Sequence, residues 1–227
     1  MSRPHEDLQR HTDVDHRPGG PPIELPPAAR FAIDIVYIKS GRLDAALSSY
    51  ETLIEKARTS GAKAGTSAVL RSENDGRVIA LVELEGHEAF GHLKSAWDNH
   101  HLTQEHRDVA ESSSLGLYQL AAVVGEPALD PTSKDVYAFE HFARSLEVSW
   151  HQRSGDPAGF QGALSQVFKG FMVFKKDDDT QSAAIYRGVQ AQNIDTFRAS
   201  VEAQRVFGAV GGQGETFVYA HPVKTFA

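Results

Sequence analysis

Histidines gather in one short stretch of this 227-residue chain, residues 86–107. Imidazole exchanges a proton near neutral pH, so a half-buried histidine can act as a general base. Trp97 lies four residues before His101, and this spacing places the two side chains on one face of a helix. The stretch therefore predicts a proton-transfer site on a helix, with His92, His100 and His101 as its candidate catalytic residues.

Four further residues are candidates for substrate binding. Trp97 and Tyr118 are expected to line the same pocket, because Tyr118 lies on the strand that follows the helix. In the second half of the chain, His151 and Arg187 are expected to face the opposite sheet. Arg187 could hold an anionic phenolate or carboxylate, and an ion pair with Glu147 or another acid is the alternative.

The same histidines indicate metal binding only weakly. The motif His-Glu-x-x-His does not occur, and His92 and His100 are two helical turns apart, too far to share one ion. His101 and Glu105 could chelate, but two ligands do not make a site. We therefore expect no metal and no cofactor. The alternative for each histidine is a structural hydrogen bond, and two are expected to lie at the surface, namely His87 and His106.

The elements that must position these residues follow a regular order in the first half of the chain. Strands are predicted at residues 31–38, 66–71, 77–84 and 115–124, and helices at 43–57 and from His87 onward. The helices show apolar residues at three- and four-residue spacing, and Asp75-Gly76 is typical of a hairpin turn. The order β-α-β-β-α-β is that of a ferredoxin-like unit.

A similar order returns in the second half. Strands are predicted at residues 146–151, 171–174, 183–189 and 215–220, with helices that begin at Asp156 and Asn193. We therefore predict an α+β fold of two tandem ferredoxin-like β-α-β-β-α-β repeats, packed as a dimeric-α/β-barrel-like pseudo-dimer. Such packing buries the face of each sheet that carries no helices.

This organisation divides the chain into four segments. Residues 1–28 are rich in Pro, Gly, His and charge and are expected to form a disordered arm. Residues 29–125 form the first repeat and residues 146–227 the second. Residues 126–145 are interpreted as a linker or crossover, in which 136–139 could add an extra strand.

Composition excludes several classes of protein. The net charge is −7 and there is no long basic run, which argues against a general nucleic-acid binder. The chain has no cysteine, so disulfides, thiolate metal sites and cysteine nucleophiles are excluded. No apolar run is long enough to span a membrane. We expect a cytoplasmic protein whose partner is a small molecule, with neither a membrane nor nucleic acid as partner.

Two stretches resemble a known family, the antibiotic-biosynthesis-monooxygenase branch of the dimeric α/β barrels, in duplicated form. Residues 154–160 resemble its turn into the first helix, and residues 87–101 its second helix, where histidines recur. The Glu-x-Trp often found on the third strand of that family is absent at 83–85 and at 189–191. Pocket chemistry is therefore expected to differ between the halves.

The resemblance implies a cofactor-independent monooxygenase or cyclase that acts on an aromatic or polyketide-like molecule, with a histidine as general base. Deprotonation of a phenol or hydroxyquinone would give an electron-rich species that reacts directly with oxygen. The alternatives are a non-catalytic small-molecule-binding barrel and a haem- or metal-binding member of the superfamily. The duplicated barrel makes a homodimer unnecessary for folding without forbidding one.

Overall fold

The computed structural model describes residues 29–60, 64–72, 75–125, 128–144, 168–199 and 216–226. Within these residues eight strands form a closed barrel, in the order β1-β3-β2-β8-β5-β7-β6-β4. All neighbouring strands are antiparallel. Closure pairs every strand on both sides, which removes the exposed edges of an open sheet.

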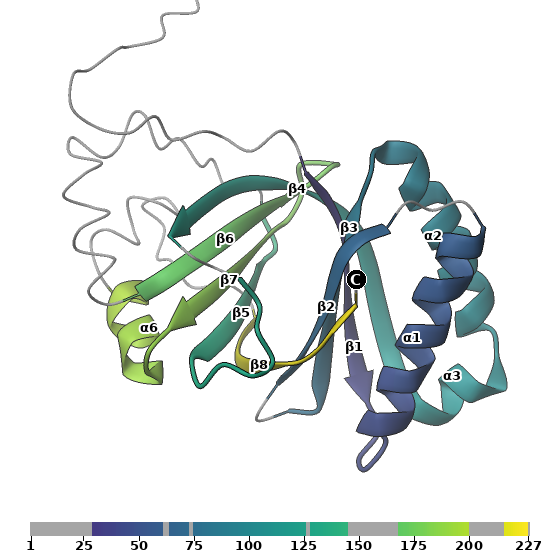
Figure 1. The fold of residues 1–227 in the computed structure, drawn as a ribbon, viewed down its shortest axis with the longest axis horizontal. Helices are drawn as coiled ribbons and strands as arrows, with labels where there is room; N and C mark the ends of the chain where they lie inside the picture. The colour runs from purple at the N-terminus through teal and green to yellow at the C-terminus, as the bar shows by residue number, and fades with distance from the viewer. Residues whose placement is uncertain are drawn as a thin grey trace, which may run out of the picture.

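The first half of the barrel carries three helices on its outer face (Figure 1). Its elements are β1 (Arg30–Ile38), α1 (Leu43–Thr59), β2 (Ala64–Ser72), β3 (Arg77–Leu84), α2 (His87–His101), α3 (Gln104–Val109) and β4 (Ala110–Gly125). In the second half, α6 packs against the outer face of the strands. The elements described there are β5 (Val136–Phe142), β6 (Phe168–Lys176), β7 (Ser182–Gly188), α6 (Ala191–Arg198) and β8 (Thr216–Phe226).

Alternation along β1 separates two cores. Ala32 and Val36 pack in the cluster under the helices, whereas Ile33 packs in the barrel interior. Successive side chains of a strand point to opposite faces, so Asp34 lies on the helix side between the two apolar residues. Its carboxylate is buried there. The barrel interior is apolar and filled by side chains from both halves.

The helices follow the predicted apolar stripes. On α1 the buried residues include Tyr50, Leu53 and Ile54, and α2 buries Ala89, Leu93, Trp97 and His100. This spacing of three or four residues keeps one face of each helix on the sheet. His100 therefore belongs to the buried stripe of α2, while the neighbouring His101 lies at its border.

The second half differs from the sequence expectation at its start. The segment interpreted as a linker or crossover contains β5, which lies between β7 and β8 in the barrel. The strand predicted at 146–151 and the helix predicted at Asp156 lie outside the described residues, as does the arm 1–28. Asn193 does not cap a helix, because α6 begins at Ala191 with Gln190 as its N-cap.

The two halves have the same internal strand order. It is β4-β1-β3-β2 in the first half and β8-β5-β7-β6 in the second, so the fourth, first, third and second strands follow one another in both. The halves join where β2 pairs with β8 and where β4 pairs with β6. Each junction is an antiparallel ladder with one register shift, and together they close one barrel from both halves.

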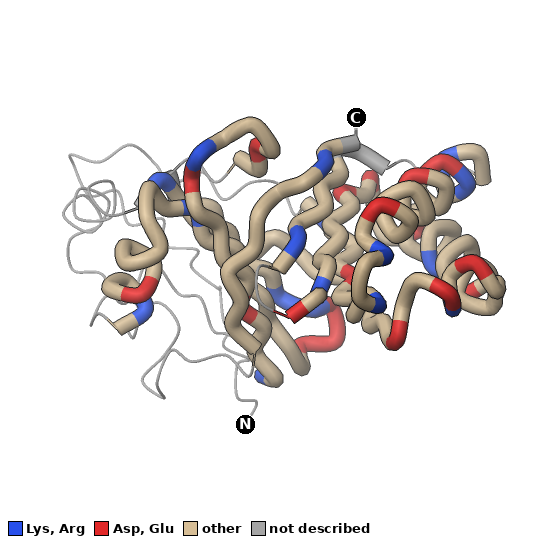
Figure 2. The backbone as a smooth tube through the Cα atoms, turned by 90° about the horizontal axis from the view of Figure 1, so that it is seen from below, with Lys and Arg blue, Asp and Glu red and all other residues tan. Residues whose placement is uncertain are grey.

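The surface charges are mixed in sign. Lys and Arg alternate with Asp and Glu along the helices, and the strands of the barrel carry far fewer charges (Figure 2). In the parts of the chain that the structure describes, no helix is both long and apolar enough to cross a membrane.

Candidate functional site

Three histidines meet where α2 ends and α3 begins. His106 stacks against His101 with ring centroids 4.2 Å apart, and its centroid lies 5.3 Å from that of His100. Thr103 fixes this geometry, since its hydroxyl accepts from the backbone N–H of His106 and donates to the carbonyl of His100. A capped turn between two helices therefore brings the three imidazoles together.

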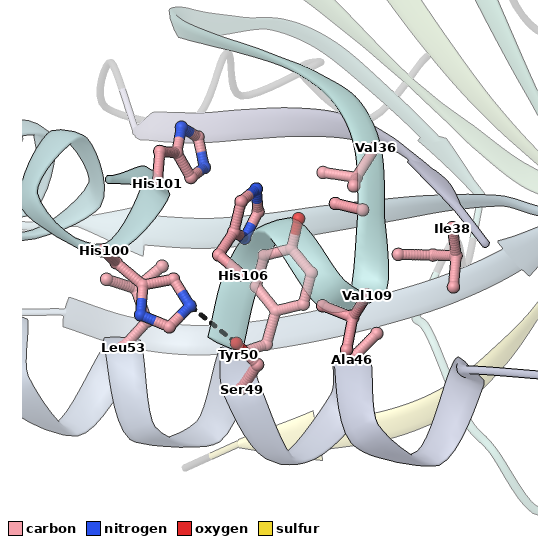
Figure 3. A pocket seen from close by; sticks show the side chains of 11 residues that line it. Val36, Ile38, Ala46, Ser49, Tyr50, Leu53, His100, His101, His106 and Val109 are labelled. Atoms are coloured by element: carbon pink, nitrogen blue, oxygen red, sulfur yellow. Dashed lines mark hydrogen bonds between the residues drawn. The ribbon is translucent and has the colours of Figure 1, made fainter. Parts of the chain in front are cut away.

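The histidines border a small cavity between the helices and the sheet (Figure 3). Its volume is about 10 Å³, which matches a single water molecule. Apolar side chains of β1, α1 and the start of β4 form most of the wall, and the polar part of the lining comprises Ser49, Tyr50, His100, His101 and His106. The cavity thus presents polar groups in an otherwise apolar setting.

His100 is buried and held by α1. Its Nε2 lies 2.6 Å from the hydroxyl of Ser49, and its Nδ1 has no hydrogen-bond partner. Burial lowers the pKa of His100, and the positive charge of Lys56 lowers it further. A neutral imidazole is the consistent state at pH 7, because a second ring proton would be buried without an acceptor.

His101 and His106 are half-buried and also favour the neutral form. Burial is the largest cause that lowers the pKa of His101, and the charge of His100 is the next. Burial and the charges of His101 and His100 lower the pKa of His106 to about 4. Once one ring is protonated, its charge opposes protonation of the others. The cluster is therefore neutral at pH 7 and can accept about one proton.

A buried carboxylate lies beneath this cluster. Asp34 is only 1% exposed, and its Oδ2 accepts hydrogen bonds from the hydroxyl of Tyr50 at 2.7 Å and from the indole N–H of Trp97 at 2.8 Å. Its Oδ1 has no hydrogen-bond partner by ordinary geometry. The rings of Tyr50 and Trp97 also touch, with centroids 5.4 Å apart. The three side chains form one buried unit.

The environment of Asp34 raises its pKa to about 6. Burial is the largest cause, and the hydrogen bonds from Tyr50, Trp97 and the Ser114 backbone oppose it only in part. No cation is among the groups that act on this carboxyl. Asp34 is therefore ionised at pH 7 but is a stronger base than an ordinary aspartate, which is typical of functional sites.

The structure brings together three of the residues predicted from sequence. His100, His101 and Trp97 lie in one region, and the Trp97 and His101 rings meet edge to face at 6.3 Å. His92 is exposed on α2, away from the cavity lining. His151 lies outside the described residues.

Two other predicted residues lie elsewhere. Tyr118 packs in the barrel interior, on the opposite face of the sheet from the histidines, because Leu117 takes the helix-facing position. Burial raises the pKa of Tyr118 to about 12. Arg187 belongs to the second half and forms an ion pair with Asp135, through Nε and a terminal nitrogen at 2.7 Å each. The ion-pair alternative is thus the observed one, with Asp135 as the acid.

Sequence reasoning missed four residues of the site. His106 was expected at the surface but stacks inside the cluster, because α3 turns back over the end of α2. Ser49 and Tyr50 lay within an apolar helix stripe and gave no separate signal. Asp34 did give a signal in the sequence, since it is the only charged residue in the apolar run Phe31-Ala32-Ile33-Asp34-Ile35-Val36.

The described residues of this site do not form a ligand set for a metal ion. Among the residues that the structure describes, no three His, Asp or Glu side chains converge as ligands of one ion. The polar groups instead suit hydrogen bonding and proton transfer.

Comparison with known proteins identifies the fold. No protein-family model and no curated protein matches the sequence. Among solved structures, an anthrone oxidase-like protein matches with a TM-score of 0.60 and 12% identity, over 88% of this chain and 94% of the other. A variant chlorite dismutase from Candidatus Nitrospira defluvii matches with a TM-score of 0.51 and 9% identity, over 86% and 90% respectively. The protein therefore has the dimeric α/β-barrel fold that its sequence pattern suggested.

Proposed function

We propose that this protein is a cofactor-independent monooxygenase or cyclase that acts on a hydroxylated aromatic or polyketide-like small molecule. The observation that carries the proposal is the half-buried, neutral His101, which borders the cavity and contacts Trp97. A neutral imidazole in an apolar setting can take the proton of a phenol or enol. The resulting anion is electron-rich enough to react with oxygen directly, and Trp97 contributes an aromatic wall.

Binding of such a substrate requires the cavity to enlarge. A bicyclic molecule needs far more than about 10 Å³ of space. We propose that α3 moves outward, since this helix has only six residues and carries His106 on the cavity wall. The similar fold of an anthrone oxidase-like protein supports the proposal, since an anthrone is a fused-ring ketone whose enol form carries a hydroxyl group.

We also propose that the chain is an internal duplication of a β-α-β-β-α-β unit, so that one chain supplies what two protomers supply in a dimeric barrel. The shared strand order of the two halves supports this. Further association into a homodimer and a cytoplasmic location remain expectations of the same proposal.

The test is oxygen consumption with hydroxylated naphthalenes, anthrones and quinones, measured with an oxygen electrode. We expect uptake by the wild type and a loss of at least about 100-fold in His101→Ala, the ordinary contribution of a general base. The matched control is His87→Ala, on the same helix, where the side chain is 71% exposed. Equal turnover in His101→Ala and the wild type would refute the role of His101. No uptake with any of these compounds would favour the non-catalytic binding barrel.

A further inference from the structure

The two halves of the barrel carry a buried acid at the same place. Asp34 on β1 lies opposite Ala80 on β3, and Glu140 on β5 lies opposite Ala184 on β7. Both strands are the first of their half and hold the same position in the strand order. Both carboxylates point to the outer, helix-covered face and are at most 1% exposed. The two acids therefore occupy equivalent positions, and they differ in the side chains that surround them.

A tyrosine hydroxyl donates to each acid, and among the residues that the structure describes a cation pairs with Glu140 but not with Asp34. Tyr186 donates to Glu140 at 2.8 Å, as Tyr50 does to Asp34 at 2.7 Å. Arg198 then binds both oxygens of Glu140, at 2.6 and 3.1 Å. The partners of Asp34 are the neutral donors Tyr50 and Trp97. A buried carboxylate that is paired with arginine is a structural ion pair. A buried carboxylate without a cation lowers the stability of the fold, so its presence points to a role other than stabilisation.

The unbalanced carboxylate determines what Tyr50 offers to the cavity. A tyrosine hydroxyl has one proton to donate and lone pairs that accept. The proton of Tyr50 is directed at Asp34, and Tyr50 also lines the cavity beside the histidines. Because this proton is held by Asp34, the Tyr50 oxygen has only its lone pairs to offer to a group that reaches it from the cavity. Each neutral imidazole of the cluster adds one nitrogen lone pair and one N–H donor on the same wall, so a preference that depends on Tyr50 must be assigned by variants.

We infer that Asp34 is a positioning residue that holds the Tyr50 proton and so makes Tyr50 a hydrogen-bond acceptor, which selects ligands that donate, such as phenols and enols, over the matching ethers. The inference rests on the proposed function in placing the ligand in the same site. It goes further in naming the group that the site recognises and in assigning recognition to the first half of the chain.

Phenol and anisole are the smallest matched pair of probes, since they differ in that anisole has a methyl ether in place of the hydroxyl donor. Their dissociation constants are measured on the intact protein at about pH 7.5 by ligand-observed NMR titration, where Asp34 is ionised. We expect phenol to bind the wild type about tenfold more tightly than anisole, the effect of one hydrogen bond to a buried acceptor. Binding is measured without turnover, so its result is independent of oxygen chemistry.

Three variants test whether the preference for phenol over anisole depends on Asp34 and Tyr50. Asp34→Ala removes the acceptor of the Tyr50 proton and so frees that proton, and Tyr50→Phe removes the hydroxyl itself; each should reduce the phenol-to-anisole ratio to about threefold or less. Tyr186→Phe makes the equivalent change in the second half and should leave the ratio unchanged. A merely structural defect would weaken both probes together and would not change their ratio.

The outcomes separate this inference from the proposed function. An unchanged ratio in both Asp34→Ala and Tyr50→Phe would overturn it and assign the preference to the histidines, even if the protein consumes oxygen. Failure of both probes to bind the wild type would also overturn it. A ratio that falls in these two variants supports it, even if oxygen uptake is never detected. Thermal melts of each variant confirm that the protein titrated is folded.

Discussion

Replacement of Asp34 by asparagine should change how the stability of the protein depends on pH. The pKa of Asp34 is about 6 in the folded protein against 3.8 for the free side chain. Below pH 3.8 both states are protonated, and between these values the folded protein holds the proton that the unfolded chain has lost. As pH rises through about 6, the wild type therefore loses stability, by about 2.2 × 1.36, or roughly 3 kcal/mol.

The asparagine side chain of the Asp34→Asn variant is uncharged at every pH, and its amide oxygen can still accept from Tyr50 and Trp97. The difference in unfolding free energy between the variant and the wild type should then move in favour of the variant by about 2.4 kcal/mol from about pH 4 to about pH 7, because a small part of the loss already occurs below pH 4. All other titrating groups cancel in this difference. The amide N–H group, which would meet no partner at the position of Oδ1, adds a cost that does not depend on pH.

Urea denaturation at half-unit steps from about pH 4 to about pH 8 measures this difference. With slopes of about 2 kcal/mol per molar urea, the midpoint of the variant should rise relative to the wild type by more than about 1 M over the range. Above about pH 7 the difference should be constant, because Asp34 is then ionised throughout, and this region is the internal control. A difference that stays flat over the lower part of this range would refute the raised pKa and the reasoning built on it.

Two further predictions concern the other ionisable groups. Arg198→Met leaves the charge of Glu140 buried without its cation and should cost about 3–5 kcal/mol at pH 7, while the double variant Arg198→Met/Glu140→Gln should recover much of this loss in urea denaturation. The pKa of His106 is about 4 when folded against 6.5 when free, so its contribution to stability is present above pH 6.5 and is lost as pH falls through 4. His106→Phe should therefore resist acid better than the wild type, by about 1–2 kcal/mol at about pH 4.5 relative to pH 7 after allowance for solvent screening; equal acid sensitivity in thermal melts would contradict this.

Part of the site could be predicted because it depends on local spacing. The stripe of α2 follows from residues three and four apart, so the contact between Trp97 and His101 was expected and is observed. Spacing did not show that His100 would be the more deeply buried of the two neighbouring histidines. That depends on how α2 is rotated against α1, where Ser49 meets the ring.

Sequence by itself determined the order of elements in the first half, because periods of two and of three to four residues reflect burial on one face of a strand or helix. It also determined that the chain holds no cysteine chemistry.

The tertiary structure alone decided that β5 is a full member of the barrel, since a short apolar strand is recognised only by the neighbours that pair with it. It alone paired Asp34 with Tyr50 and Trp97, and Glu140 with Arg198. Most of these partners lie far apart in the chain, and only the closed fold brings them within hydrogen-bonding distance.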